Sequence, residues 1–177
     1  MSFDFSDNHF SLFGLPVQFR QDVVDIEAVY RTLQAQYHPD RAVTGSDSDK
    51  RFALQAATHI NDAFHTLKSP LARARYLLKL QGFDTQEETN TSMPADFLMQ
   101  QMEWREAIAE AKQTHDLDEL EALATQLRSE SRSLTTLIAG LIDDKQDFNR
   151  AGLVVRKLRF IEKLEQEIGD AIEALLD

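Results

Sequence analysis

The chain has 177 residues, 42% of them apolar and 28% charged, which is the balance of a soluble globular protein able to form one domain or two small ones. The absence of cysteine excludes disulfides and thiolate-bound zinc or iron–sulfur clusters, and the net charge of −11 disfavours nucleic acid as a partner. No apolar run approaches the roughly 18 residues of a membrane helix, and the N-terminus lacks the basic region of a signal peptide, so the sequence predicts a cytoplasmic protein without membrane contact.

Two long helices are predicted in the first 82 residues. Apolar side chains recur every three or four positions over residues 23–37, after the suitable capping residues Asp22 and Asp25, and this helix is expected to end at His38-Pro39. The same spacing from about residue 49 predicts a second helix that stops at Ser69-Pro70. Because a loop of about ten residues joins them, we expect an antiparallel hairpin with an exposed loop.

A shorter helix over 71–81, closed by Gly82, completes the first predicted unit, residues 1–82. Residues 83–93 form a predicted linker, because 84–92 are polar throughout and show no apolar recurrence. Three helices are then expected, at about 94–114, 117–141 and 154–175. Their apolar stripes and short connections favour an antiparallel three-helix bundle over 94–177, so the predicted fold is all-α.

The charge is divided unevenly between the two predicted units. Residues 1–81 carry nine Lys and Arg against nine Asp and Glu, whereas residues 82–177 carry ten against twenty-one. The second unit is therefore expected to prefer a basic protein surface as its partner. The five histidines include no HExxH motif and no pair four residues apart, so neither a metal site nor a cofactor is expected.

The tripeptide His38-Pro39-Asp40 falls in the loop of the predicted hairpin. Taken by itself it has a structural explanation, in which Pro39 ends the helix, Asp40 forms a turn and His38 is an ordinary surface residue. A different alternative is a helical enzyme that uses His38 and Asp40 as an acid–base pair, although an exposed loop offers no concave site for a substrate.

Several segments around this tripeptide resemble the J-domain family, and they occur in the family's order. They are His9-Phe10-Ser11-Leu12-Phe13-Gly14-Leu15, Tyr37-His38-Pro39-Asp40, Ile60-Asn61-Asp62-Ala63-Phe64-His65-Thr66-Leu67, Pro70 and Arg73-Ala74-Arg75-Tyr76. The resemblance implies a loop that docks on a DnaK-class chaperone ATPase and triggers ATP hydrolysis there, so that the chain activates an enzyme without being one. In that setting Pro39 limits loop entropy, Asp40 accepts a charge-assisted hydrogen bond from a chaperone arginine, and His38 orders the loop.

The chain differs from the family pattern in its basic residues. Family members often carry several on the helix before the tripeptide, whereas here Arg31 alone lies within that helix. Arg31 and Arg41 are expected to contact the chaperone, with Lys50 and Arg51 flanking the same loop. The alternative for Arg31 is an ordinary solvated position on the helix surface.

The helix over 94–114 has two kinds of face. One is apolar and is expected to pack in the bundle core, with Phe97, Trp104, Ile108 and Ala111. Another mixes apolar and acidic side chains, namely Leu98, Met99, Met102, Glu103, Glu106 and Glu110. Phe160 on the last helix is rotated by about 200° from Leu158 and is also expected to be exposed. These residues favour a partner site, because methionines adapt to a partner's shape and glutamates attract a basic surface; alternatively, the apolar ones pack on the first unit or in a wide core.

The whole chain is similar to the J-domain co-chaperones of iron–sulfur cluster assembly, the HscB family. In the second unit the resemblance is carried by Phe97-Leu98-Met99-Gln100-Gln101-Met102-Glu103-Trp104-Arg105-Glu106 and Val155-Arg156-Lys157-Leu158-Arg159-Phe160. It implies an HscA-type chaperone as one partner and an IscU-type scaffold protein as the other, the scaffold bound through Leu98, Met99, Met102, Glu103, Glu106, Glu110 and Phe160. Met102 stands where leucine is common, a change that conserves volume. A J-domain protein with a different client is the alternative.

Overall fold

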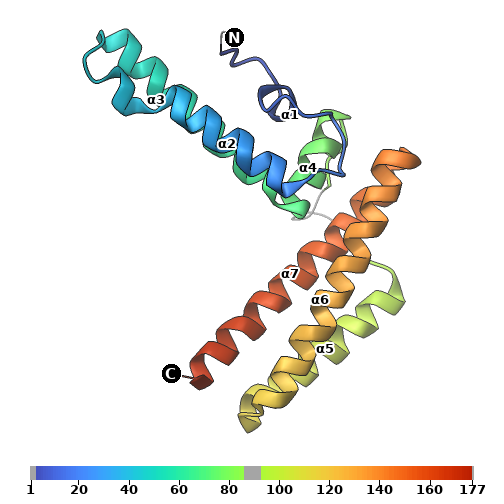
Figure 1. Ribbon diagram of the computed structural model, residues 1–177. Coiled ribbons are helices and arrows are strands. Elements are labelled where there is room, and N and C mark those ends of the chain that lie inside the picture. The colour runs from blue at the N-terminus through green and yellow to red at the C-terminus, as the bar shows by residue number, and fades with distance from the viewer. Residues whose placement is uncertain (1–2, 86–92, 177) are drawn as a thin grey trace. The chain divides into compact units, whose positions relative to one another are not determined.

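The computed structural model describes residues 3–85 and 93–176, and the regular structure of these residues is entirely helical (Figure 1). The predicted all-α fold is therefore confirmed. The chain divides into two compact units, residues 1–81 and 82–177. Residues 86–92 of the predicted linker lie outside the described residues. Among the helices that are described, none is long and apolar enough to cross a membrane.

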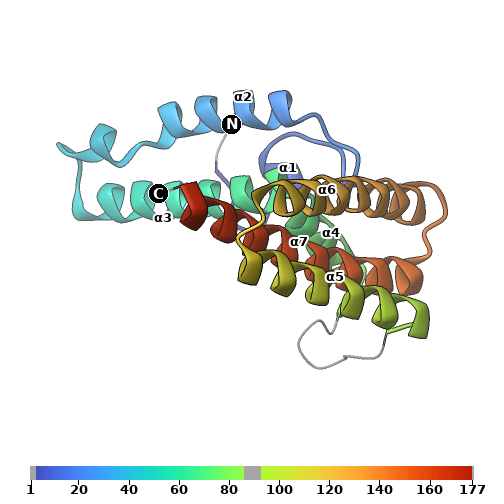
Figure 2. The same ribbon diagram turned by 90° about the horizontal axis from the view of Figure 1, so that it is seen from below.

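The first unit is built on an antiparallel hairpin of two helices. It contains α1 (His9–Leu12), α2 (Val23–Tyr37), the 3-10 turn η1 (Pro39–Ala42), α3 (Asp47–Lys68) and α4 (Pro70–Leu80). Figures 1 and 2 show α2 and α3 side by side, with the connecting loop at one end of the pair. The predicted hairpin is confirmed, whereas α1 has only four residues and was not predicted from the sequence.

Local side-chain chemistry sets the helix boundaries of this unit. Asp22 caps α2 by accepting a hydrogen bond from the Val24 amide at 2.8 Å. Ser46 and Asp49 form a capping box, so that α3 begins at Asp47, two residues before the position expected from the apolar spacing. Ser69 caps α4, and the left-handed Gly82, with φ of 78°, follows its last turn.

The apolar spacing predicted the core of the hairpin only in part. Ile26 of α2 and Ile60 and Leu67 of α3 are fully buried, and other apolar residues of this unit are also buried, among them Phe10, Phe13, Phe19, Leu71, Leu77 and Leu78. Val23 and Phe52 have the same spacing but remain 41% and 40% exposed. They lie near the ends of their helices, where fewer neighbours are available to cover them.

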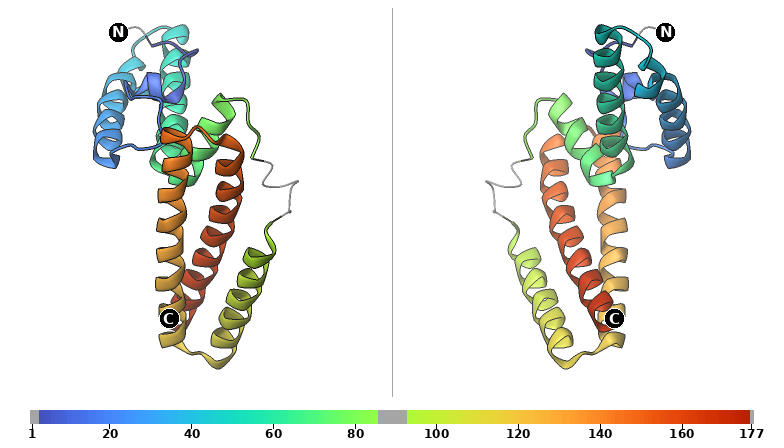
Figure 3. Two further views of the ribbon diagram at one scale, coloured as in Figure 1. Left: turned by 90° about the vertical axis from the view of Figure 1, so that its right-hand side faces the viewer. Right: turned by 90° about the vertical axis from the view of Figure 1, so that its left-hand side faces the viewer.

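The second unit is the predicted antiparallel three-helix bundle, which is confirmed. It contains α5 (Ala95–Thr114), α6 (Leu117–Ala139), the π-helical turn η2 (Gly140–Asp144) and α7 (Phe148–Leu176), and Figure 3 shows the three long helices alongside one another. Pro94 occupies the N-cap position immediately before α5. The predicted face of α5 is buried in the core, since Phe97, Trp104, Ile108 and Ala111 are at most 4% exposed.

Helix α7 begins six residues before the predicted start at 154. The additional segment contains Ala151 and Gly152, which are both buried. Small side chains permit close packing, but they contribute little to an apolar periodicity, so the sequence pattern could not place this end of the helix.

Candidate functional site

The tripeptide itself makes local hydrogen bonds within the loop between α2 and α3. His38 is the C-cap of α2, and Pro39 is the first residue of η1. The Nδ1 atom of His38 accepts a hydrogen bond from the Asp40 amide at 3.2 Å, and the Arg41 amide donates to the His38 carbonyl at 3.0 Å. The side chains of His38 and Asp40 are 54% and 85% exposed. The loop therefore presents the Asp40 carboxylate to solvent from an ordered backbone, and it is an exposed surface unlike the concave site of an enzyme.

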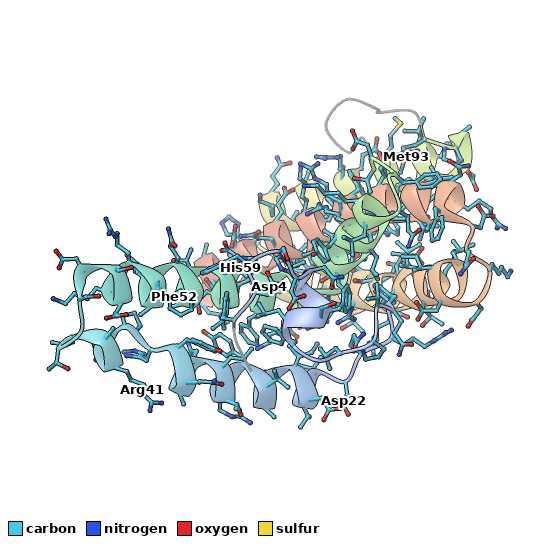
Figure 4. The ribbon with its side chains drawn as sticks, turned by 90° about the horizontal axis from the view of Figure 1, so that it is seen from above. Asp4, Asp22, Arg41, Phe52, His59 and Met93 are labelled. Carbon is cyan, nitrogen blue, oxygen red and sulfur yellow. The ribbon has the colours of Figure 1, made fainter. Side chains whose placement is uncertain are left out.

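Arg41 ties the loop back to the end of α2. Its Nη1 atom donates a hydrogen bond to the Ala35 carbonyl at 2.8 Å, which satisfies one of the acceptors left open in the last turn. The positive charge also lies at the C-terminal end of the helix, where the helix dipole favours it. Figure 4 shows Arg41 at the loop end of the hairpin.

Arg31 is exposed on α2, one turn after Glu27. The Glu27 carboxylate is paired with Lys68 of α3 at 2.9 Å. The hydrogen bond and the charge of Lys68 hold the pKa of Glu27 below its ordinary value, with a smaller contribution from the charge of Arg31. Because Lys68 is the main partner of Glu27, the Arg31 guanidinium is available at the surface of the helix that leads into the tripeptide.

Polar and aromatic contacts join α2 to α3 along the hairpin. The rings of Tyr30 and Phe64 stack with centroids 3.9 Å apart, and the Tyr30 hydroxyl donates to Oδ1 of Asn61 at 2.9 Å. The Lys68 ammonium lies 5.3 Å from the Phe64 ring centroid. Asn61 and Phe64 belong to a segment that carries the J-domain resemblance, and in this structure they support the hairpin.

An aromatic cluster, made by the N-terminal segment, lies beside the tripeptide. The Phe3 ring packs edge-to-face against Tyr37 at 5.0 Å, and Phe3 and Phe5 contact Phe52 of α3 at 6.1 and 5.7 Å. Figure 4 shows Asp4 of this segment near Phe52 and His59. This cluster was not predicted from the sequence. The closely spaced Phe3 and Phe5 were its only sequence signal, and they do not indicate where the segment packs.

Residues of the Arg73-Ala74-Arg75-Tyr76 segment connect α4 to the rest of the first unit by hydrogen bonds and ring contacts. Buried Arg73 donates through Nη1 to the Leu67 carbonyl at 2.7 Å, and its guanidinium lies 4.8 Å from the centroid of the Phe19 ring. The Tyr76 hydroxyl accepts a hydrogen bond from the His9 amide at 3.0 Å, and the two rings stack at 4.4 Å. These residues position α1 and the C-terminal end of α3 and lie away from the loop.

The second unit carries an exposed face in which apolar and acidic side chains are mixed. Leu98, Met99 and Met102 of α5 are 42%, 65% and 63% exposed. The glutamates predicted to accompany them are also exposed, at Glu103, Glu106 and Glu110. The alternative in which these three apolar side chains are buried in a wide bundle core is therefore wrong. We call the set Leu98, Met99, Met102, Glu103, Glu106 and Glu110 the acidic methionine face.

Phe160 departs from the prediction, because its side chain is half-buried instead of exposed. Its ring packs edge-to-face against the buried Phe97 of α5, with centroids 6.0 Å apart. The Arg105 guanidinium lies 5.2 Å from the Phe160 ring centroid. Phe160 therefore lies on the flank of α7 that meets α5. Since Leu98, Met102 and Arg105 are four and three residues apart on α5, they share one stripe that leads to this ring.

Within the described residues, no group of three or more His, Asp or Glu side chains is arranged to hold a metal ion. The candidate site thus consists of two separate surfaces. One is the loop of the first unit, with an exposed carboxylate, and the other is the acidic methionine face of the second unit with the half-buried Phe160 at its edge.

Comparison with known proteins gives matches over both units. A family model described as the HSCB C-terminal oligomerisation domain matches residues 93–169. A co-chaperone protein HscB homolog from Chromobacterium violaceum is 56% identical over 177 residues and covers 100% of both chains. A homolog of the same description from Ralstonia nicotianae is 49% identical over 172 residues, 97% of this chain and 98% of the relative.

Solved structures agree with these matches. The chaperone HscB from Vibrio cholerae is 37% identical, covers 96% of this chain and 99% of its own, and superposes with a TM-score of 0.85. The human co-chaperone protein HscB is 30% identical, covers 94% of this chain and 82% of its own, and gives a TM-score of 0.88. The Jac1 co-chaperone from Saccharomyces cerevisiae, at 24% identity and a TM-score of 0.72, shares the fold.

Proposed function

Because this chain belongs to the HscB family of co-chaperones, we propose that it stimulates ATP hydrolysis by a DnaK-class chaperone of the HscA type and delivers to it an iron–sulfur scaffold protein of the IscU type. The chain itself performs no chemistry in this proposal. One unit contacts the chaperone, the other holds the scaffold, and cluster transfer and maturation of iron–sulfur proteins are assisted as a result.

The main support for the proposed chaperone contact is the exposed loop at His38-Pro39-Asp40. The Asp40 carboxylate is 85% exposed and is held by a backbone that His38 and Pro39 restrain. A carboxylate presented in this way is suited to a charge-assisted hydrogen bond from an arginine of the chaperone, and little loop entropy is lost when the bond forms. Arg41 beside the tripeptide and Arg31 farther back on α2 provide positive charge for an acidic chaperone surface.

The acidic methionine face supports the scaffold contact. Three exposed apolar side chains on one helix supply area to bury, while Glu103, Glu106 and Glu110 attract a basic surface and fix its orientation. Phe160 adds an aromatic edge whose ring is already positioned by Phe97 and Arg105. Positioned aromatic residues are typical of the residues that dominate binding energy.

Having both contacts on one chain brings the scaffold and the chaperone close together. A scaffold bound to the second unit is held near a chaperone bound to the first, so that its local concentration rises without any new contact. Because the chain lacks cysteine, it offers no thiolate that could compete with the scaffold for its cluster.

A second candidate function for the bundle is self-association, because the matching family model is described as an oligomerisation domain. The charge of the acidic methionine face disfavours it, because a two-fold pairing of this face would place the glutamates of one copy against those of the other. Sedimentation of the free chain separates the two: a monomer that forms a one-to-one complex with the scaffold supports scaffold binding, and a dimer that the scaffold does not dissociate supports self-association.

The test of the proposed function is single-turnover ATP hydrolysis by the chaperone, measured with and without the chain and with and without scaffold. We expect the chain to accelerate hydrolysis and the scaffold to increase this effect. If the chain accelerates hydrolysis but does not bind the iron–sulfur scaffold, it is a J-domain protein with another client. If it has no effect on the chaperone, the assignment of the loop is wrong.

A further inference from the structure

An open groove lies beside the acidic methionine face, within the second unit. Its volume is about 510 Å³, and it is formed by residues of all three helices of the bundle, among them Asp96, Phe97, Met99, Glu103, Glu130 and Lys157. Met99 and Glu103 belong to the acidic methionine face, so the groove and the face form one continuous surface. A partner that lies on that face also reaches the groove.

Gln100 and Glu103 of the groove lie on the opposite flank of α5 from the stripe that leads to Phe160, while Phe97, which also lines the groove, packs against Phe160. At about 100° per residue, Gln100 of the groove and Leu98 of the stripe are about 200° apart around the helix axis. Met99 lies between them on the outer surface. The exposed surface of α5 thus extends from the side next to Phe160 of α7, across Met102 and Met99, to the side next to Glu130 of α6.

The charge of the groove is unbalanced. Three carboxylates, those of Asp96, Glu103 and Glu130, line it with a single ammonium group, that of Lys157. The Lys157 ammonium lies 5.0 Å from the centroid of the Phe97 ring, and this ring is 4% exposed. The groove therefore already accommodates one cation on an aromatic floor, and its remaining negative charge suits another.

We propose that the groove receives a lysine or arginine side chain of the scaffold protein, which extends the scaffold contact from α5 across to α6. The inference rests on the proposed function and adds residues that the face alone does not include, chiefly Glu130 and Lys157. The cation of the scaffold joins the three carboxylates and competes with Lys157 for the aromatic floor. Glu130 is then a residue that binds the scaffold, whereas the positive charge of Lys157 weakens the binding of the scaffold's cation.

Of the three carboxylates, Glu130 is the best one to change. Asp96 lies in the first turn of α5, where negative charge also stabilises the helix, and Glu103 also belongs to the acidic methionine face. Glu130→Gln is expected to weaken scaffold binding by the full chain roughly two- to fivefold at low salt, with the difference decreasing as salt is added. The matched control is Glu121→Gln on the same helix. It removes the same charge nine residues away, which is the opposite side of α6 at about 100° per residue, and it should leave binding unchanged.

Lys157 tests the same idea with the opposite sign. Lys157→Met keeps the apolar stem that covers Phe97 and removes only the competing charge. It is expected to strengthen scaffold binding roughly two- to fivefold, whereas Lys163→Met on the exposed surface of α7 should not. Thermal unfolding of each variant shows whether the bundle is intact.

The outcomes separate this inference from the proposed function. If wild-type chain binds the scaffold and Leu98→Ala weakens that binding, but Glu130→Gln and Lys157→Met behave as their controls do, the groove takes no cation and the inference is overturned. If the wild-type chain does not bind the scaffold at all, the proposed function fails instead. If Lys157→Met causes the chain to dimerise without tighter scaffold binding, a second copy occupies the groove and the inference is likewise overturned.

Discussion

The imidazole of His38 and the backbone of Asp40 are joined by a hydrogen bond, in which Nδ1 of His38 accepts from the Asp40 amide at 3.2 Å. The neutral ring must therefore carry its proton on Nε2, which faces away from this bond. The same contact places the His38 side chain at the N-cap of η1, where Pro39 fixes the next backbone angle. The direction of the Asp40 carboxylate thus depends on all three residues of the tripeptide.

The tripeptide is expected to act on the chaperone alone. Asp40→Asn removes the charge of the proposed hydrogen bond, and His38→Gln removes the imidazole that orders the loop. Asp40→Asn should reduce stimulation of chaperone ATP hydrolysis at subsaturating chain about 10- to 100-fold, as expected for loss of a hydrogen bond to a charged group. His38→Gln should also reduce it, because the Asp40 amide loses its imidazole acceptor. The unfolding temperature and the affinity for the scaffold should stay at wild-type values. Asp47→Asn, which removes a charge from the first turn of α3, is the matched control; a loss of scaffold binding in the tripeptide variants would refute two independent sites.

The acidic methionine face is expected to act on the scaffold alone. Leu98→Ala and Met99→Ala remove exposed apolar area and should each weaken scaffold binding by about 1 kcal/mol or more, with little effect on folding. Isothermal titration calorimetry measures the affinity. Leu137→Ala on α6 is the control, since Leu137 is 43% exposed, close to the 42% of Leu98. Equal affinity of all four proteins would remove these residues from the scaffold contact.

The N-terminal aromatic cluster should stabilise the end of α2 that leads into the loop. Phe3→Ala removes edge-to-face contacts with Tyr37, Phe5 and Phe52, and pairs of this kind contribute about 0.5–1.5 kcal/mol each. We expect a lower free energy of unfolding, measured by urea titration, together with weaker ATPase stimulation, because Tyr37 adjoins His38. Phe3→Leu should recover part of the stability. Unaltered stability in Phe3→Ala would show that the segment is not packed on the hairpin in solution.

His9 should make the first unit sensitive to acid. Burial lowers the pKa of His9, the nearby His59 lowers it further, and Asp62 opposes both effects. The unfolded chain therefore binds this proton more readily than the folded chain does. The contribution of His9 to stability is complete above its ordinary pKa of 6.5 and is lost as the pH falls below that value toward the lowered pKa.

The measurement is the unfolding midpoint of the wild-type chain and of His9→Phe, on both sides of pH 6.5. The phenyl ring retains the stacking on Tyr76 but cannot be protonated, so the variant should lose less stability in acid than the wild type does. His65→Phe, which replaces an exposed histidine of the same unit, is the matched control. Parallel pH profiles for all three proteins would contradict a role for His9.

The parts of the structure that the sequence predicted are those fixed by local chemistry. His38-Pro39 and Ser69-Pro70 end helices through the restrictions that proline imposes, and the spacing of Phe97, Trp104 and Ile108 predicted the buried face of α5. Asn61, in one of the segments that carry the J-domain resemblance, accepts a hydrogen bond from Tyr30, a contact that depends on the residue types at both positions.

The parts that it did not predict depend on neighbours far along the chain. Helix α1 is a single turn whose position is fixed by Tyr76, 67 residues from His9. Phe160 was expected to be exposed because periodicity on α7 gives its direction around that helix but not which flank α5 covers. The groove at Glu130 needs three helices to form, so no pattern within one helix indicates it.

The most direct test of the central claim, that one chain joins two independent sites, is a mixing experiment. The His38→Gln chain retains the proposed scaffold site, and a Leu98→Ala/Met99→Ala chain retains the tripeptide. Single-turnover ATP hydrolysis by the chaperone is measured with scaffold present, at concentrations below both dissociation constants. We predict that an equimolar mixture of the two variants fails to reproduce the stimulation by wild-type chain, because the two contacts are no longer on one molecule. Full stimulation by the mixture would contradict the account.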